Sequence, residues 1–190
     1  MNFLNSLTLE KIFLGLVIVL IFYVILAYNG FVKRKFRVKE AWSDIEVQLK
    51  RRHDLIDNLV EIVKGYMKHE SETLTKVIEA RNSAIRAKNI KELGEKENIL
   101  NSTLKELFLL VENYPNLKAN ENFLHLQQEL TDTENKIQAA RRFYNQMVLD
   151  YNTFLNIFPN NILNLIFRFK EEEFFDLESS TEAQKPEIKF

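Results

Sequence analysis

The sequence contains no cysteine and very little glycine or proline. Of its 190 residues, four are glycine and three are proline. Without cysteine the chain has no disulfide, no thiolate nucleophile, no cysteine-bound zinc or iron–sulfur centre and no cysteine for a lipid anchor. Because β-sandwiches and α/β folds need turn residues at short intervals, the scarcity of glycine and proline argues against both classes and favours long helices.

The chain also lacks an excess of charge of either sign. It has 26 basic and 27 acidic residues and a formal net charge of −1 at pH 7. A whole-chain nucleic-acid-binding protein would be strongly basic, so we expect no nucleic-acid partner. The length leaves room for one domain of ordinary size and one or two terminal segments.

A long uncharged run lies near the N-terminus. It begins at Ile12 and continues to Val32, which gives roughly the 20 residues that a helix needs to cross a bilayer core of ~30 Å. A cleaved signal peptide is the competing interpretation, but Glu10 and Lys11 precede the run and no small-residue cleavage site follows it. We therefore predict a short extracytoplasmic N-terminus over 1–11 and an uncleaved transmembrane helix over 12–32.

A basic cluster follows the uncharged run directly. The positive-inside rule places this cluster and the chain after it in the cytoplasm, and the N-terminus outside. The same charges can contact anionic lipid headgroups, although a role in topology alone would account for them. The predicted membrane-contacting residues are Lys33, Arg34, Lys35, Arg37 and Lys39.

The rest of the chain carries apolar residues at heptad spacing in four runs. This spacing marks helices that each bury one stripe. The first run begins at Val38, and the fourth repeats every seven residues from Phe123. Because proline restricts the residue before it to extended geometry, the third run should end near Pro115 and the fourth near Pro159. We predict an all-α protein, an N-terminal transmembrane helix followed by an antiparallel, up-and-down four-helix bundle with long, coiled-coil-like helices.

The first run can be one helix or two. If the chain reverses near residues 69–71, the four helices alternate in direction and the two longest lie side by side. If the first helix continues to Ala87, the helix of the fourth run extends past the end of the first helix, where it has nothing to pack on. We favour the reversal and keep the continuous helix as the alternative, since Gly65 and Ser71 are weak breakers.

The C-terminal part holds one more apolar segment and an acidic end. Segment 162–169 follows Pro159 and, in the alternating arrangement, returns to the membrane-proximal end of the bundle. There it either caps the bundle, which we favour, or lies among lipid headgroups. We assign 33–170 to the helical domain. Residues 171–190 are acidic and poor in apolar side chains after Leu177, so we predict a disordered tail.

No residue pattern typical of an active site or cofactor site is present. The three histidines lack the Glu-x-x-His spacing of di-iron bundles, and His69-Glu70 lacks the second histidine of a zinc-protease motif. Glu121 and His125 could face one metal ion, but no second such pair accompanies them. We therefore predict a non-enzymatic protein without catalytic, cofactor-binding or metal-binding residues.

Several polar residues lie on or beside the predicted seams. Antiparallel packing of the first and fourth helices would bring them within a turn or two of one another. Polar groups at seams can fix the register of packed helices, and unpaired surface charges are the alternative interpretation. The predicted structural network comprises Arg51, Arg52, Asp54, Asn58, Glu134 and Arg141.

Two long stretches resemble the LemA family. Residues 41–70 read AWSDIEVQLKRRHDLIDNLVEIVKGYMKHE, and residues 116–152 read NLKANENFLHLQQELTDTENKIQAARRFYNQMVLDYN. The resemblance extends over roughly 28–175. The chain departs from the family pattern at Asp57, where proline is usual, and at Arg168-Phe169, where Gly-Phe is usual.

The resemblance implies a bacterial protein with one N-terminal transmembrane helix, a short N-terminus outside and a cytoplasmic helical bundle. This topology agrees with the separate argument from flanking charge. The family has no established molecular function and brings no catalytic residues. A magnetosome-associated relative suggests a role in membrane organisation by analogy.

Two functional hypotheses follow for a single-pass protein of the bacterial inner membrane. The first is a scaffold or adaptor that presents its cytoplasmic bundle to a protein partner. The second is a membrane-surface or lipid-organising protein that self-associates and uses the basic cluster and segment 162–169 to contact headgroups. An enzyme is the third and least favoured class. The identity of the partner stays open. The oligomeric state also stays open, and a homo-oligomer is one of its alternatives.

Overall fold

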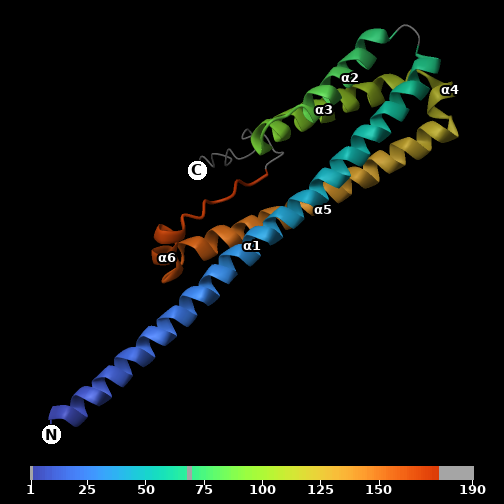
Figure 1. The fold of residues 1–190 in the computed structure, drawn as a ribbon. Coiled ribbons are helices and arrows are strands. Elements are labelled where there is room, and N and C mark those ends of the chain that lie inside the picture. Colours follow the sequence, from blue (N-terminus) through green and yellow to red (C-terminus); the bar gives the residue numbers. More distant parts are fainter. Residues whose placement is uncertain (1, 68–69, 176–190) are drawn as a thin grey trace, which may run out of the picture. The chain divides into compact units, whose positions relative to one another are not determined.

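A computed structural model describes residues 2–67 and 70–175, with side chains from residue 10 onward. The regular structure of these residues is entirely helical, as the sequence predicts (Figure 1). The helices are α1 (Asn2–Tyr66), α2 (Ser71–Ile85), α3 (Ile90–Val111), α4 (Pro115–Lys118), α5 (Glu121–Asn156) and α6 (Asn160–Phe167).

The chain divides into two compact units. The first unit contains Met1–Glu40 and Gln146–Glu172, and the second contains Ala41–Asn145 and Glu173–Phe190. Helices α1 and α5 each contribute residues to both units. Each unit is described by itself.

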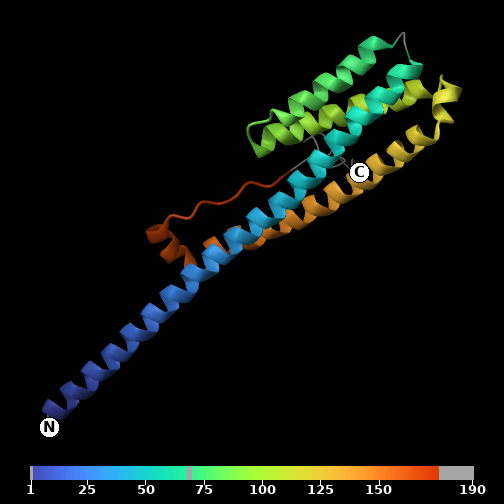
Figure 2. The ribbon, with the colours of Figure 1, turned by 45° about the vertical axis from the view of Figure 1, so that its right-hand side comes forward.

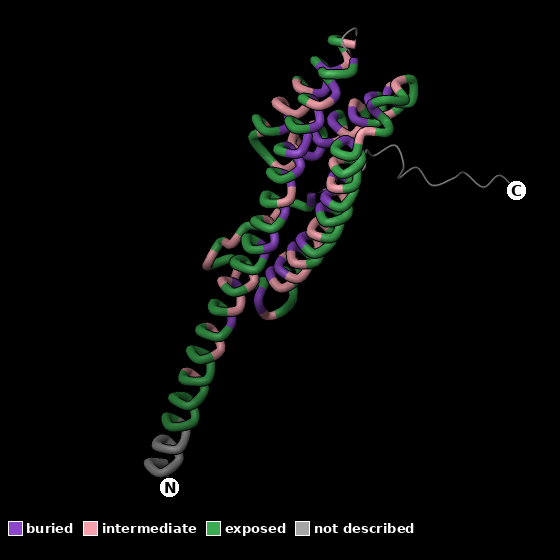
Figure 3. The backbone as a smooth tube through the Cα atoms, turned by 90° about the vertical axis from the view of Figure 1, so that its right-hand side faces the viewer, coloured by how far each residue is buried: buried purple, intermediate pink, exposed green. Residues whose placement is uncertain are grey.

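Helix α1 changes character along its length. From residue 10 to the middle of the apolar run its side chains are almost all exposed, and buried positions begin only at Ala27 (Figure 3). An exposed, uncharged helical stretch of this kind suits a lipid environment. Within the described residues, α1 is the one helix long and apolar enough to cross a membrane.

The first unit packs the end of α5 and the short helix α6 against α1. Phe31 and Ala27 of α1 are buried, as are Tyr151 and Leu155 of α5. Gly30 allows the close approach of α5, because a Cβ atom at this position would lie 2.8 Å from Cζ of Phe154. Replacing this glycine would therefore force the two helices or the ring to move.

The second unit has one hydrophobic core to which five helices contribute. Its buried residues include Ile56 and Leu59 of α1, Val77 of α2, Leu104 of α3 and Leu130 of α5; Leu117 of α4 also belongs to it. Helices α2 and α3 lie side by side in both views (Figures 1 and 2). Two asparagines start helices of this unit: Asn89 accepts a hydrogen bond from the Glu92 amide, and Asn120 accepts one from the Phe123 amide.

The predicted helix ends agree with the structure in three places. Helix α1 ends at Tyr66 and α2 begins at Ser71, which excludes the continuous first helix. Helix α3 ends at Val111, before Pro115, and α5 ends at Asn156, before Pro159. The proposed domain limits of 12–32 and 33–170 stay predictions.

The predicted tail begins too early. Residues 171–175 form no helix, but their backbone is held by side chains of α5, and Phe175 is fully buried. The sequence pattern missed this because two adjacent aromatic residues at the end of an acidic stretch, Phe174 and Phe175, have no periodicity that shows which of them is buried. Residues 176–190 lie outside the described part of the chain.

Candidate functional site

The second unit buries a cluster of charged side chains. Arg52 of α1 lies with Nη1 3.1 Å from Oε2 of Glu97 on α3, and the other carboxylate oxygen of Glu97 is 2.8 Å from Nε2 of His53. Glu97 has no exposed surface, and both basic partners are buried. Because a buried charge is tolerated only when it is paired and hydrogen-bonded, each member of the cluster depends on the others.

Two further residues complete the surroundings of Arg52. Its Nη2 donates to the side-chain oxygen of Asn101 on α3. Its Nη1 also lies 3.1 Å from Oε2 of Glu134 on α5, within ion-pair distance although not in hydrogen-bond geometry. One guanidinium group therefore contacts α3 and α5 from α1, which fixes how these three helices align.

The structure brings together only some of the residues of the predicted polar network. Arg52 and Glu134 meet, whereas Arg51 pairs with Glu129 at 3.1 Å. Asp54 and Asn58 are exposed and are not in the cluster; Arg141 is half-buried with partners of its own.

Sequence reasoning missed the residue at the centre of the cluster. The third apolar run of the sequence contains Leu93, Leu100, Leu104, Leu107 and Val111, and Glu97 lies at the seam position between the first two of these leucines. The spacing 93–97–100–104 has the 4-3-4 rhythm of a buried stripe. A charged residue in that rhythm was the available signal that Arg52 has a buried acidic partner.

The cluster offers no open position for chemistry. Both oxygens of Glu97 are occupied by basic side chains, and Arg52 is surrounded by acceptors. Within residues 2–67 and 70–175, no three histidine, aspartate or glutamate side chains gather as a metal site would require. His69 lies outside the described residues. The cluster is therefore best understood as structural.

The predicted basic cluster is partly occupied by protein contacts. In the first unit, Arg34 pairs with Asp150 at 3.0 Å and stacks 3.8 Å above the Phe154 ring. Lys35 pairs with Glu172 at 3.6 Å. Lys39 also has partners, whereas the side chains of Lys33 and Arg37 are exposed. Arg34 and Lys35 therefore help to attach the end of α5 and the segment after α6 to α1.

Helix α6 is held against α1 by one face only. The Tyr23 hydroxyl donates to Oδ1 of the buried Asn160 at 2.8 Å. The Tyr28 ring packs on Phe167 at a centroid distance of 5.1 Å, and Phe31 packs on Phe169 at 5.2 Å. Other apolar side chains of α6, among them Leu165 and Ile166, are exposed, so segment 162–169 is only partly buried in the first unit.

Asparagine side chains in α5 hold the extended segment after α6. In the first unit, the Asn152 carboxamide donates to the carbonyl of Glu172 and accepts from its amide, both at 3.0 Å. In the second unit, Asn145 makes the same pair of bonds with the backbone of Phe175. The Phe175 ring lies edge-on to Trp42 at a centroid distance of 5.4 Å. The carboxamides supply the donor and acceptor that a neighbouring strand would supply in a sheet.

A tyrosine of α5 adds to this attachment. The Tyr151 hydroxyl donates to the carbonyl of Lys170 at 3.1 Å. Burial, and to a smaller extent the nearby Glu172 carboxylate, raises the pKa of Tyr151 to about 12. The phenol therefore remains a neutral donor throughout the physiological pH range.

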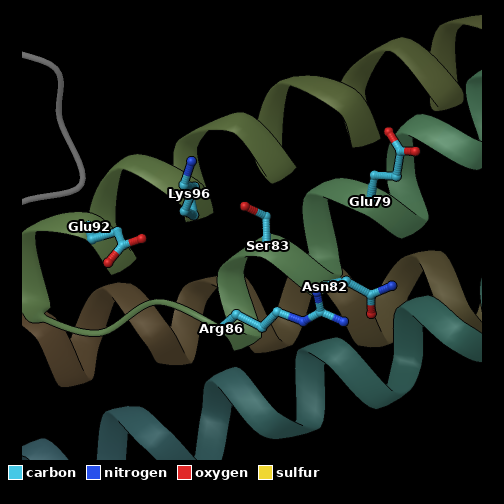
Figure 4. A pocket seen from close by; sticks show the side chains of 6 residues that line it. All are labelled: Glu79, Asn82, Ser83, Arg86, Glu92 and Lys96. Carbon is cyan, nitrogen blue, oxygen red and sulfur yellow. The ribbon is translucent and has the colours of Figure 1, made fainter.

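A polar hollow of about 360 Å³ lies on α2 and α3 (Figure 4). Its lining contains two acidic and two basic side chains on exposed or half-exposed positions. These charged side chains do not converge on one point of the hollow (Figure 4). The lining residues are Glu79, Asn82, Ser83, Arg86, Glu92 and Lys96.

Comparisons with known proteins agree with the family resemblance. The LemA family model matches residues 41–190. Protein LemA of Metamycoplasma hominis is 28% identical over 188 residues, which cover 90% of this chain and 84% of that protein. Magnetosome protein MamQ 2 of Paramagnetospirillum magneticum is 24% identical over 185 residues, 84% of this chain and 68% of that protein. MamQ of Magnetospirillum gryphiswaldense is 24% identical over 178 residues, 80% of this chain and 65% of that protein. The family match, over more than half of the sequence, shows that this chain is a member of the LemA family.

Proposed function

We propose that this protein is a single-pass membrane-anchored scaffold or adaptor without enzymatic activity. In this proposal α1 crosses the bacterial inner membrane with its N-terminus outside. The second unit lies in the cytoplasm as an antiparallel, up-and-down four-helix bundle and binds a protein partner there. The alternative is a lipid-organising, self-associating protein at the membrane surface.

The observation that carries the proposal is the uninterrupted helix α1. One helix supplies both the exposed apolar stretch and core residues of the second unit, from Ile45 to Val63. No glycine-rich or proline-rich linker separates these two parts of α1. Such a linker would let a catalytic domain move freely relative to its anchor. The buried charge cluster, which offers no reactive group, is consistent with a binding rather than a catalytic role.

The second unit also has exposed apolar side chains from which a partner could gain contact area. Val47 of α1, Leu109 of α3 and Phe143 of α5 are each more than half exposed. Single exposed apolar residues are normal on protein surfaces, so these three positions serve as probes of the surface of the second unit.

Photo-crosslinking in intact cells tests the proposal. A photoreactive amino acid is placed in turn at Val47, Leu109 and Phe143, and at exposed Glu61 as a matched control, and crosslinked products are identified by mass spectrometry. A reproducible protein partner at one apolar position, absent at Glu61, supports the adaptor. Crosslinks only to a second copy or to lipid at all three positions overturn it in favour of the alternative. No crosslink at any position also counts against the adaptor.

A further inference from the structure

We propose that α6, with the turn before it, inserts into one leaflet of the membrane beside α1 and contacts lipid acyl chains. The proposal rests on α1 being a membrane span, as in the proposed function. It adds a second membrane-embedded element, which is separate in sequence from the apolar run near the N-terminus.

The position of α6 along α1 is fixed by contacts within the first unit. Asn160 at the start of α6 accepts a hydrogen bond from Tyr23, and Phe167 at its end packs on Tyr28. Phe169, just beyond the helix, packs on both Tyr28 and Phe31. Helix α6 therefore lies beside residues 23–31 of α1.

The length of the span then sets the depth of α6. From Ile12 to Phe22, the part of α1 before these contacts, the helix rises only about 16 Å at ~1.5 Å per residue. A bilayer core is ~30 Å thick. Starting the span earlier would place Glu10 and Lys11 in the hydrocarbon, which is costly. Residues 23–31 must therefore lie in the membrane too, and α6, which packs against them, lies at the same depth.

The surface of α6 suits this depth. Four apolar side chains of the helix and the turn before it are more than half exposed, with Leu165 at 79% and Phe158 at 77%. In water such a face would be an unusual cost, whereas in lipid it is favourable. The exposed apolar residues are Phe158, Ile162, Leu165 and Ile166.

Several polar groups nearby are paired within the protein, as a lipid environment favours, whereas Oδ1 of Asn164 is buried without a hydrogen-bond partner. The Asn160 carboxamide accepts from Tyr23 and donates to the carbonyl of Phe154 at 3.2 Å. The amide of Asn164 donates to the carbonyl of Phe169 at 3.2 Å. Two exposed basic residues, Arg168 and Lys170, follow directly and can contact anionic headgroups at the leaflet surface.

We favour lipid over a protein partner on this face because it is continuous with the exposed surface of the span. On α1 at the same level, Ile25 and Leu26 are themselves more than half exposed. Whatever surrounds those residues in the membrane also surrounds α6.

Site-directed spin labelling of the full chain tests the proposal. The sequence has no cysteine, so single substitutions give labels without background. We would place the label at Leu165 on α6, at Ile25 and Leu20 on α1, and at exposed Val47 in the second unit. The protein is reconstituted in nanodiscs of phosphatidylcholine and phosphatidylglycerol in equal amounts. Collision with oxygen, which concentrates in lipid, is compared with collision with a water-soluble nickel chelate.

At Leu165 the ratio of oxygen to nickel accessibility should match that at Ile25 and exceed that at Val47 about tenfold, since transferring a polar chelate into hydrocarbon costs more than ~1.4 kcal/mol. A lipid-like ratio at Leu20 with a water-like ratio at Leu165 overturns the insertion of α6 and leaves the anchor intact. Water-like ratios at both positions overturn the anchor itself. Low accessibility to both reagents at Leu165 means that protein covers the face, which also overturns the proposal.

Discussion

The two units bury their polar groups in different ways. The second unit buries charged side chains and pairs them across helices, as in the contact of Arg52 with Glu97. In the first unit the charged pairs stay partly exposed, and the buried polar side chains include the neutral Asn160. A charge pair selects a particular partner helix, whereas a carboxamide can bind any backbone. The charge pairs of the second unit set helix register, whereas the neutral carboxamide of the first unit is compatible with a membrane.

The largest effect is expected from removal of the Glu97 carboxylate at the centre of the buried cluster. Glu97→Ala leaves Arg52 and His53 buried without their common partner, so we expect a loss of about 3–5 kcal/mol in the free energy of unfolding. Denaturant unfolding of the detergent-solubilised full chain, followed by circular dichroism, measures it. The control is Glu95→Ala on the exposed side of the same helix, which should change stability by less than about 0.5 kcal/mol. Equal effects of the two changes would show that the cluster does not stabilise the second unit.

The next test concerns the anchor of the extended segment. Phe175→Ala removes a fully buried ring that packs on Trp42, so we expect a local loss of about 3 kcal/mol. Trp42 is the one tryptophan of the chain, and its fluorescence should shift to longer wavelength as water reaches the indole. Phe174→Ala is the matched control, because Phe174 is half exposed. If both variants keep the wild-type emission, Phe175 does not hold the segment.

A smaller effect is expected where α5 meets α1. Gly30→Leu places a side chain where a Cβ atom alone would overlap the Phe154 ring, and we expect a destabilisation of about 1–3 kcal/mol. Gly15→Leu introduces the same side chain into open space on the same helix and should leave stability unchanged. Thermal unfolding in nanodiscs compares the two variants. A similar melting temperature for both would contradict the close approach of the helices.

The smallest change should stabilise the protein. Arg168 ends α6 with a φ of 56°, the left-handed conformation that favours glycine. Arg168→Gly should therefore raise the free energy of unfolding by about 1 kcal/mol. Arg168→Ala removes the charge but keeps the unfavourable conformation, so it separates the two causes. A gain from both changes would assign the effect to charge instead.

The sequence predicted the parts of the fold that depend on periodicity and on proline. Val38, Ile45, Leu59 and Tyr144 lie on predicted stripes and are buried. The helix ends before Pro115 and Pro159 follow from local backbone restriction. The prediction of burial is wrong at the ends of the stripes. Tyr66 and Phe158 are exposed there, because no partner helix covers those positions in the described structure.

The candidate sites were harder to predict because they depend on contacts between distant residues. Arg52 was recognised on its stripe, but its partner Glu97 is 45 residues away and was hidden within a leucine-rich run. The segment after α6 is held by Asn145 and Asn152, and an asparagine in a helix gives no local sign that it will bind a backbone. The two faces of α6 likewise become distinct only once Tyr23 and Tyr28 are known to contact one of them.

The asparagine contacts of α5 have an evolutionary consequence. Asn152 and Asn145 bind the main chain of residues 172 and 175, and main-chain groups are the same for every amino acid except proline. Substitutions other than proline in this segment should therefore cost little, except at Phe175, whose ring is buried, and to a smaller extent at Glu172, which pairs with Lys35. Related proteins should keep the two asparagines and one aromatic residue while the residues between Lys170 and Phe175 drift.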